Sequence, residues 1–544
     1  MDFFDWSNPH LYIAMILSVI NAVLLCFEGY KFLQIIQLSG YHLRGYFDWL
    51  KDTRGKYVVR LLSLSLLSLA CLLVTNAIFS SFVDYLSYLG LILYFVLSIF
   101  LIVKIYRAPK KTPLKMTNRM NRSISVLFVL NLIVSFGFIA LSSVFIPSLR
   151  FSIVALTPLT LLITVPFAHW LLKPVEKAIN RGYVRKAKAV LAERKDLIKI
   201  GITGSYGKTS VKNFLTAILA EKYSVCSTPL NFNTPMGVTK TVLEFLSESH
   251  QVLIAEMGAR QVGDIKELCE IVEPQYGILT SVGEQHLATF YSIDNIKRTK
   301  AELPNYLGKD GCCVFDGDNE NTRAIYDKSV CKKSFVSLTD KNADCFATDI
   351  VQTSTGTNFV AHIKNIGEVK CETKLFGKHN VVNILLCITL ANKLGLSVEE
   401  IEKGVARILP VEHRLQLIRA ENDVLILDDT YNASIEGSNR ALEVLGSFEG
   451  YRKIVVTPGL VELGTMERLA NYNFGGKIAS VADLVVIMNK THYPAIKEGL
   501  VDAGFDENKI LHADTMDGVK QLMAENIKPK DIVLWENDLP DNYR

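Results

Sequence analysis

The sequence contains no Cys-x-x-Cys pair, although it has 10 cysteines in 544 residues. Zinc ribbons and disulfide frameworks need closely spaced cysteines, so the scatter argues against both and favours a reduced, cytosolic setting. The formal net charge is only +4, and charged residues make up 21%. The chain therefore lacks the basic footprint of a nucleic-acid-binding protein and the charge excess of a disordered one. Internal repeats and low-complexity tracts are also missing.

Charged residues are almost absent from five long apolar runs in the first 172 residues, at 11–27, 58–79, 83–105, 124–146 and 151–172. A helix needs about 20 such residues to cross a bilayer. The first run is flanked by Asp2 and Asp5 and has no basic segment before it, so it does not resemble a cleavable signal. We expect an N-terminal α-helical transmembrane bundle of about five spans at 1–172.

Lysine and arginine collect in alternate connections between these runs, at 31–56, 104–122 and 173–188. Basic loops favour the cytoplasmic side. This predicts a multi-pass protein of the inner (plasma) membrane, with the N-terminus outside and the large C-terminal part in the cytoplasm. The loops also suit contact with anionic lipid or a lipid-linked pyrophosphate, although topology alone explains them.

The soluble part divides into a basic linker at 173–196 and two α/β domains. At 197–408, expected strands (197–203, 251–257, 276–281 and 312–315) alternate with helices such as 208–222 and 264–271, and 380–407 is helical. This alternation favours a largely parallel sheet covered by helices. After a break near 408–410, domain 409–544 looks Rossmann-like, without the dinucleotide glycine fingerprint. Its expected strands are 424–427, 453–457, 484–488, 510–513 and 532–535.

A glycine-rich loop follows the first soluble strand, in the order Gly204, Ser205, Tyr206, Gly207, Lys208, Thr209, Ser210. Glycines let backbone N–H groups approach phosphate oxygens, and the next helix turns its positive end toward them. The lysine would reach the terminal phosphates, and the threonine would offer a hydroxyl to Mg²⁺. Ile202 stands where the common eight-residue form has its first glycine, so the shorter loop points to a group of ATP-dependent ligases.

Two further residues follow successive strands at the edge where such sheets carry their sites. Glu256 ends the second strand, and His286 comes a few residues after the next. A carboxylate beside a phosphate loop is well placed to bind Mg²⁺. Together the two side chains form a candidate metal site.

From about 197 to 544 the chain resembles the Mur ligases, specifically the branch that adds D-Ala-D-Ala to a muramyl tripeptide. The resemblance is carried by an ordered set of segments that covers about two thirds of the protein: 203–209, 228–237, 256–259, 282–287, 300–303, 377–380, 413–414, 428–433 and 461–464. Each segment is weak by itself, and their order and spacing are specific.

The resemblance implies a role for individual residues. Lys208 and Thr209 would hold the ATP phosphates and one Mg²⁺, and Glu256 and His286 a second Mg²⁺. Lys300 matches a lysine that is carbamylated in much of the family, and it would act as a catalytic group beside the metal. The nucleotide would also be contacted by Asn380, Asn383, Arg414 and Asp429. The substrates would be contacted by Asn231, Asn233, Thr234, Tyr431 and Asn432.

The implied reaction uses ATP to turn a carboxylate into an acyl phosphate, which an amine then attacks. The amine would come from an amino acid or dipeptide. Two departures put the named substrate in doubt: the membrane unit replaces the branch's N-terminal substrate domain, and the chain ends in an acidic tail where the branch has Lys-Gly-Ser. We expect a lipid-linked or membrane-proximal carboxylate acceptor of an envelope glycan precursor. Two alternatives stay open. One is a poly-γ-glutamate synthase, and the other is an ATP-driven transporter, which would need polar residues in spans that show few.

Overall fold

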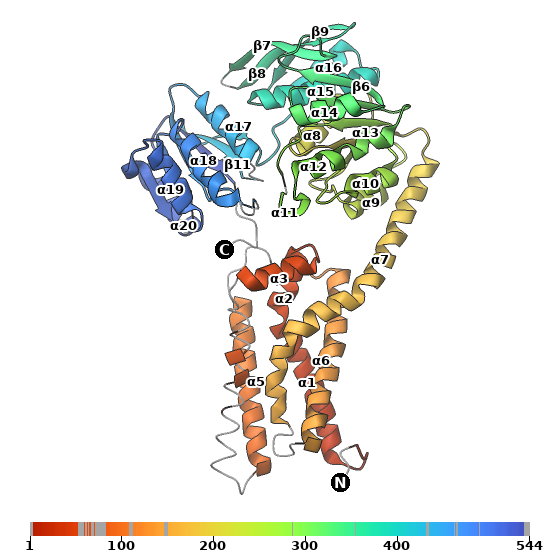
Figure 1. Ribbon diagram of the computed structural model, residues 1–544, viewed down its shortest axis with the longest axis vertical. Coiled ribbons are helices and arrows are strands. Elements are labelled where there is room, and N and C mark those ends of the chain that lie inside the picture. The colour runs from red at the N-terminus through yellow and green to blue at the C-terminus, as the bar shows by residue number, and fades with distance from the viewer. Residues whose placement is uncertain are drawn as a thin grey trace. The chain divides into compact units, whose positions relative to one another are not determined.

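The computed structural model describes residues 4–52, 59, 62–63, 65–66, 70, 83–107, 113–145, 151–285, 287–353, 355–430, 435–461, 463, 466–488 and 490–537. The chain forms two compact units, divided between Asn180 and Arg181. We call them the helical unit and the α/β unit (Figure 1). The α/β unit contains two sheets, which belong to a central and a terminal domain.

The helical unit is built from α1 (Pro9–Glu28), α2 (Tyr30–Leu38), α3 (Leu43–Asp52), α5 (Val83–Arg107), α6 (Asn118–Phe145), the 3₁₀ helix η3 (Ser152–Thr160) and the first part of α7 (Leu161–Glu193). Among the described residues, three helical stretches are long and apolar enough to cross a membrane: Pro9–Glu28, Asn118–Phe145 and Ile153–Glu193. They correspond to the first, fourth and fifth expected spans.

The expectation of five spans is therefore met only in part. The run at 83–105 lies on α5, a helix of 25 residues, which is not among the three. The run at 58–79 falls largely outside the described residues. The expected boundary between a last span and a linker at 172/173 is also missing, because α7 continues to Glu193 through Pro166 and Pro174.

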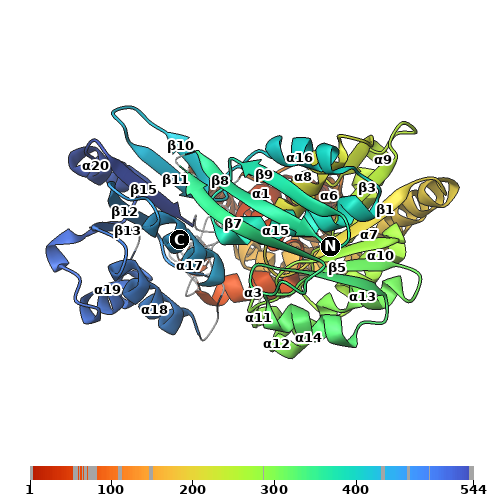
Figure 2. The same ribbon diagram turned by 90° about the horizontal axis from the view of Figure 1, so that it is seen from above.

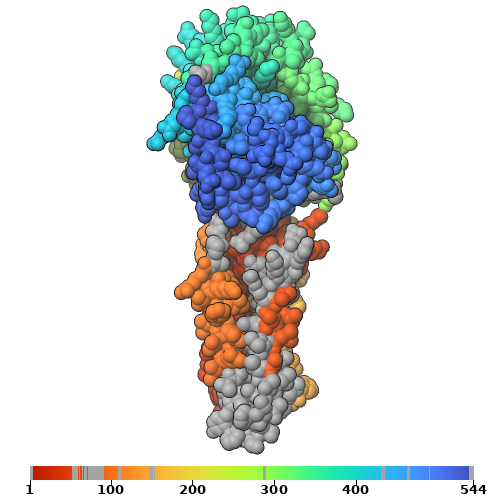
Figure 3. All heavy atoms as spheres, turned by 90° about the vertical axis from the view of Figure 1, so that its left-hand side faces the viewer, coloured from red at the N-terminus to blue at the C-terminus, as the bar shows by residue number. Residues whose placement is uncertain are grey.

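The outside of the helical unit is apolar and its inside carries polar side chains. Ile133, Leu141 and Ile163 are 62%, 61% and 71% exposed, and Figure 3 shows α5 at the surface on one face of this unit. The buried face of α1 includes Ser18, Asn21 and Glu28 at helical spacing. An apolar exterior is what a lipid environment requires, so the arrangement agrees with a membrane location.

The central domain holds a nine-stranded sheet of order β2-β3-β1-β4-β5-β6-β7-β8-β9. Its strands are β1 (Ile198–Thr203), β2 (Val225–Ser227), β3 (Val252–Glu256), β4 (Tyr276–Leu279), β5 (Cys312–Asp316), β6 (Lys332–Ser337), β7 (Cys345–Thr353), β8 (Gly356–Ile363) and β9 (Gly367–Thr373). The first seven run parallel, and β8 and β9 extend the sheet in antiparallel pairs.

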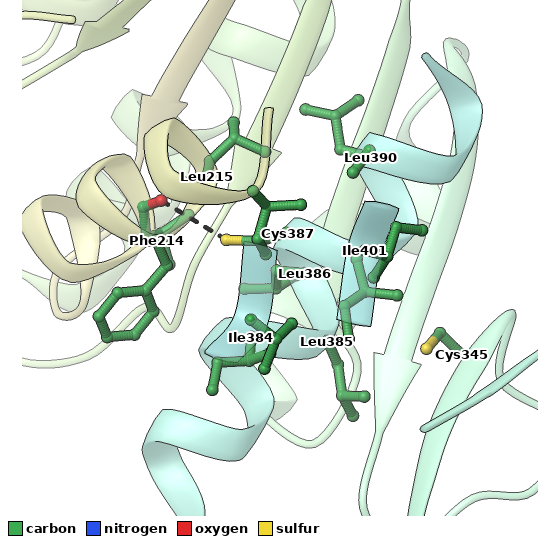
Figure 4. Close-up of a cluster of buried hydrophobic side chains, with 14 of the residues drawn as sticks. Phe214, Leu215, Cys345, Ile384, Leu385, Leu386, Cys387, Leu390 and Ile401 are labelled. Carbon is green, nitrogen blue, oxygen red and sulfur yellow. Dashed lines mark hydrogen bonds between the residues drawn. The ribbon is translucent and has the colours of Figure 1, made fainter. Parts of the chain in front are cut away.

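Helices cover both faces of this sheet: α8 (Lys208–Leu219), α9 (Pro235–Glu244), α10 (Asp264–Val272), α11 (Leu287–Phe290), α12 (Ile293–Lys300), α13 (Glu302–Leu307), α14 (Glu320–Lys328), α15 (Lys378–Lys393) and α16 (Val398–Ala406). One core lies under α8, α15 and α16. Figure 4 shows Cys387 of α15 pointing toward α8, where its thiol donates to the carbonyl of Val211 at 3.5 Å. This packing fixes α8, which begins at the phosphate loop.

The terminal domain holds a six-stranded sheet of order β10-β11-β15-β12-β13-β14 (Figure 2). Only β10, at its edge, runs antiparallel. The strands are β10 (Gln416–Arg419), β11 (Leu425–Asp429), β12 (Arg452–Thr457), β13 (Leu484–Met488), β14 (Ile510–Ala513) and β15 (Asp531–Glu536). The helices are α17 (Ile435–Gly446), α18 (Glu467–Ala479), α19 (Tyr493–Asp502), η5 (Glu507–Lys509) and α20 (Met516–Asn526).

The expected soluble strands are confirmed within one or two residues. The helical segment expected at 380–407 is instead two helices, α15 and α16, because Gly395 adopts a φ of +82° that ends the first one. Strands β2, β6, β7 and β10 were not among the expected ones. The antiparallel strands β8 and β9 were not expected either. They alternate apolar and polar residues over short stretches, without the continuous buried run of a central strand.

Candidate active site

The phosphate loop runs from the end of β1 to the start of α8, and two glycines permit its course. Gly204 has a φ of +151°, and a Cβ there would lie 1.9 Å from Oγ1 of Thr280. Gly207 has a φ of +80°, and its Cβ would lie 2.9 Å from Oδ1 of Asn383. Neither position accepts a side chain without a shift of the backbone. The loop thus closes against β4 on one side and α15 on the other.

Hydrogen bonds to the segment after β4 fix the loop. The hydroxyl of Thr280 donates to the carbonyl of Tyr206 at 2.5 Å. The backbone N–H of Ser205 donates to the carbonyl of Ser281 at 2.8 Å, and its hydroxyl to the carbonyl of Gly283 at 2.9 Å. A loop held in this way presents its remaining N–H groups without further ordering when a phosphate arrives.

The ammonium group of Lys208 folds back over this loop. Its Nζ donates to the carbonyls of Gly204 and Ser205, each at 2.8 Å. Burial lowers the pKa of Lys208 to about 8, while Glu256 opposes that change and Arg414 adds to it. Carbonyl oxygens are weak substitutes for a phosphate, so the ammonium is ready to exchange them for phosphate oxygens.

Glu256 forms the centre of the site, as the last residue of β3 beside Ile202 of β1. Its Oε1 accepts hydrogen bonds from the Thr209 hydroxyl and the Asn233 amide, both at 3.1 Å. Its Oε2 lies 3.4 Å from Nζ of Lys212, and both side chains are 2% exposed. Oε2 is buried without a hydrogen bond. A carboxylate oxygen in that condition is available to a metal ion or another cation.

Lys212 is a site residue that the sequence analysis missed. It lies one helical turn after Lys208 on α8, and its Nζ also donates to the carbonyl of Leu230 at 2.6 Å. The spacing of four residues was visible in the sequence and places both lysines on one face of the helix. Burial lowers the pKa of Lys212, and the ion pair with Glu256 opposes that change.

The donors around Glu256 fit a magnesium ion. Within the described segments, no three His, Cys, Asp or Glu side chains come together, so the described oxygen donors are the Glu256 carboxylate and the Thr209 hydroxyl. Mg²⁺ usually takes one or two protein oxygens and completes its shell with water and phosphate. His286, the other expected ligand, lies outside the described residues, and its role stays a prediction.

Lys300 ends α12 and is 3% exposed. Burial holds its pKa well below the usual range, and the positive charge of Lys208 adds to the effect. Its side chain forms no hydrogen bond or ion pair with the described residues. A lowered pKa lets a buried lysine lose its proton more readily, and the amine formed in this way is a nucleophile, which is the property that reaction with CO₂ requires.

The expected substrate and nucleotide asparagines lie around the loop in different ways. Asn233 bonds to Glu256, and Thr234 caps α9 by accepting from the N–H of Gly237 at 3.3 Å. The backbone carbonyl of Asn231 accepts a hydrogen bond from the N–H of Asn233 at 2.8 Å. Asn383 lies against Gly207, whereas the amide of Asn380 donates to the carbonyl of Phe376 at 2.8 Å.

The terminal domain contributes charge from β11 and the segment before it. Arg414 interacts electrostatically with Lys208 and Lys212. Asp429 accepts from the N–H of Leu415 at 3.1 Å, and burial raises its pKa to about 7. Its neighbour in register on β15 is Glu536, so this carboxyl faces its own domain. Tyr431 and Asn432 lie outside the described residues.

Two protein-family models match the chain over these elements. The Mur ligase middle domain matches residues 202–391, and the Mur ligase glutamate ligase domain matches residues 413–536. The chain belongs to the Mur ligase family. Together the two matches cover more than half of it, and residues before 202 lie outside both.

Individual relatives agree with this assignment. The UDP-N-acetylmuramoyl-tripeptide–D-alanyl-D-alanine ligase of Bacillus subtilis is 31% identical over 352 residues, 64% of this chain and 75% of the relative. The Escherichia coli enzyme of the same name is 28% identical over 318 residues, 57% of this chain and 69% of the relative.

Solved structures of MurF have the same fold. Acinetobacter baumannii MurF superposes with a TM-score of 0.60 at 25% identity, covering 67% of this chain and 78% of that one. Thermotoga maritima MurF in complex with ADP gives 0.59 at 26%, covering 66% and 80%. This Mur ligase is thus an ATP-dependent enzyme that forms peptide bonds.

Proposed function

We propose that this Mur ligase is a membrane-bound enzyme that joins an amine to a carboxylate of a cell-envelope precursor through an acyl phosphate. The observation that carries the proposal is the grouping of Thr209, Lys212 and Glu256 directly beside the phosphate loop. Together with Lys208 of the loop it supplies two cations, and Glu256 supplies a carboxylate oxygen that forms an ion pair with Lys212 but accepts no hydrogen bond, where a triphosphate and a second anion would meet.

The residues have separate tasks in this reaction. The loop N–H groups and Lys208 hold the β- and γ-phosphates and offset the charge that builds up during transfer. Lys212 holds Glu256 in place, and Glu256 and Thr209 are the residues that would hold Mg²⁺. Bound Mg²⁺ would neutralise phosphate charge as the acceptor carboxylate approaches. Arg414 brings further positive charge from the terminal domain, whose closure would exclude water from the acyl phosphate.

We propose in addition that Lys300 is carbamylated. In its deprotonated form the amine would attack CO₂, forming an N–C bond and releasing one proton, and the product would be an acidic group close enough to interact electrostatically with Lys208. Carbon-13 NMR of the full-length protein under ¹³CO₂ is expected to show a carbamate carbonyl that disappears in Lys300→Arg. A signal that persists in this variant would place the carbamate elsewhere.

The acceptor is proposed to be lipid-linked or membrane-proximal, and the donor an amino acid or dipeptide. Two observations support this choice. The family matches leave the helical unit unaccounted for, and the acidic end of the chain, of which Glu536 is buried at the end of β15, stands where the D-Ala-D-Ala branch that the chain resembles has a Lys-Gly-Ser turn. The relatives' names specify a UDP-linked tripeptide and D-alanyl-D-alanine, which here serve as the comparison substrates.

The proposed location is the inner membrane, with the N-terminus outside and the α/β unit in the cytoplasm. The apolar exterior of the helical unit and the basic connections support it. We also propose the domain division 1–172, 173–196, 197–408 and 409–544. The second segment continues the last helix rather than forming a separate linker.

The test is ADP release by full-length enzyme in lipid nanodiscs. Amino acids and dipeptides are screened with two acceptors, soluble UDP-muramyl tripeptide and a membrane lipid extract. We expect turnover that needs both an amine and the extract, with a hydroxamate formed when hydroxylamine replaces the amine. Rapid product formation from UDP-muramyl tripeptide and D-Ala-D-Ala would overturn the lipid-linked acceptor. A ladder of repeated additions would favour a poly-γ-glutamate synthase.

A further inference from the structure

Unsatisfied polar atoms are concentrated in the helical unit. Thirteen buried side-chain nitrogen and oxygen atoms of the described residues lack a hydrogen-bond partner, and nine of them lie before residue 181. That unit makes up about a third of the chain, so its interior is short of partners relative to the α/β unit. Such atoms in a folded protein usually mark a bound water, ion or ligand.

Glu28 is the carboxylate among them, and they also include Nε of Arg119, which lies 3.8 Å from Oε2 of Glu176. Glu28 ends α1 on the buried face of the helix, is 1% exposed, and both of its carboxylate oxygens lack a partner. A bare carboxylate is very unfavourable away from water unless it is neutralised. Yet no described lysine, arginine or histidine forms an ion pair with it. The other buried carboxylate of the unit, Glu176, is held by Arg122 through two hydrogen bonds of 2.6 and 2.9 Å.

The groups around Glu28 are hydroxyls. Tyr94 and Ser98, one turn apart on α5, interact with it, and both are fully buried. The Ser98 hydroxyl has no hydrogen bond of normal geometry. The Tyr94 hydroxyl donates its proton to Oδ1 of Asn21 at 2.8 Å. Among the described residues, the groups that interact with Glu28 therefore supply oxygen atoms and no positive charge.

Glu28, Tyr94 and Ser98 belong to a column of buried polar residues that continues to Asn21, two turns toward the N-terminus of α1. The Asn21 amide donates to the hydroxyls of Ser135 on α6 and Thr157 on η3, at 2.8 and 2.9 Å. These bonds join α1, α5, α6 and η3 around one polar line that ends at Glu28. An acidic side chain inside spanning helices is typical of ion and proton pathways.

We propose that Glu28, with Ser98 and Tyr94, forms a binding site for a single positive charge inside the helical unit, supplied by a proton or an alkali-metal ion. Hydroxyl and carboxylate oxygens are the ligands that hard cations prefer, and a proton on Glu28 would be donated to the free Ser98 oxygen. Tyr94 is the titratable group of α5 that faces the site. From α6 and η3 the polar groups of the column are Ser135 and Thr157, which are uncharged. The site would make the helical unit responsive to an ion, which a plain anchor is not.

The test uses full-length protein in lipid nanodiscs and infrared difference spectroscopy of the protonated carboxyl stretch. Wild type, Glu28→Gln and Glu176→Gln are titrated between about pH 5 and 9 in choline chloride. The titration is repeated with sodium or potassium chloride at equal ionic strength. We expect a titrating carboxyl band in wild type that is lost in Glu28→Gln. It should persist in Glu176→Gln, because Glu176 is already paired with Arg122.

The two salts separate the two sources of charge. A midpoint that is the same in all salts identifies the proton, whereas a midpoint that moves to lower pH with sodium or potassium identifies a competing metal ion. A band that survives in Glu28→Gln overturns the proposal. So does a Glu28 that stays ionised throughout with no response to either metal. Glutamine fills the same volume without charge, so this variant is expected to fold, and retained ATP turnover confirms that it does.

Discussion

The α/β unit and the helical unit of this Mur ligase place their polar groups in opposite ways. In the α/β unit the charged residues gather at the ends of parallel strands, over cores made of apolar side chains. Around Glu256 each charge has a named partner, and one oxygen is left open. In the helical unit apolar side chains cover the outside and also form two buried clusters, and polar ones form a buried line from Asn21 to Glu28. Both units therefore bury charged groups away from water, one at the strand ends of an α/β fold and the other between apolar helices.

The largest effect is expected at Lys208, where removal of the ammonium tests the α/β side of the comparison. Lys208→Ala leaves developing phosphate charge unopposed, so acceptor-dependent ADP release should fall by about a hundredfold to a thousandfold. The loop is held mainly by Thr280, Ser205 and their partners, so the protein should stay folded and membrane-inserted. Lys240→Ala, at an exposed position of α9, is the control. Near-normal turnover in Lys208→Ala would refute the assigned role.

A smaller loss is expected when the pair at the centre of the site is broken. Lys212→Met leaves Glu256 buried without its cation, which should cost about 3 kcal/mol in the free energy of unfolding, measured with denaturant. It should also lower turnover, because Glu256 is no longer held in place.

The double variant Lys212→Met/Glu256→Gln separates stability from activity. It removes the uncompensated charge, so most of the stability should return while activity stays low. If Lys212→Met were as stable as wild type, the ion pair between Lys212 and Glu256 would not stabilise the site.

A third effect comes from the lowered pKa of Lys208. The free enzyme loses this proton as the pH rises through about 8, whereas phosphate oxygens favour the ammonium in the complex. ATP binding therefore takes up a proton above that pH, and the Kd for ATP should rise by about tenfold per pH unit, with little change below it. Isothermal titration calorimetry over this range measures it. Lys208→Arg stays charged and should give a flat profile, and an equally flat wild-type profile would contradict the shift.

The sequence predicted more of the α/β unit than of the helical unit, for physical reasons. Buried parallel strands are continuous apolar runs, and the glycines at 204 and 207 indicate a tight loop between a strand and a helix. Several strands, the loop and the start of the helix could therefore be predicted from the sequence. The role of Lys212 was missed because a lysine four residues after Lys208 is usually a solvated residue, and only the tertiary fold buries it. Gly395 was likewise not recognised as a helix end, since the residues around it continue a helical pattern.

In the helical unit the hydropathy of each run predicted an apolar helix, but the sequence did not show which side chains contact one another. Asn21 and Glu28 each interrupt or end a run as single residues, and their partners lie far along the chain: Thr157 is 136 positions from Asn21. A one-dimensional pattern cannot show that such residues face one another. The continuous helix α7 was also hidden, because a change from apolar to basic composition looks like a boundary while the helical backbone continues through it.

The smallest effect concerns the hydrogen bonds of Asn21 and tests the other side of the comparison. Each of its three bonds, to Ser135, Thr157 and Tyr94, should contribute about 0.6 kcal/mol, the average for membrane helices. Asn21→Leu should thus lower the stability of the helical unit by about 1 to 2 kcal/mol in thermal unfolding of nanodisc-embedded protein, with ATP affinity unchanged. Ile133→Ala, on the apolar outside of α6, should change it little. If the two variants behaved alike, the buried polar line would contribute nothing beyond ordinary packing. The contrast between the two units would then be one of composition only.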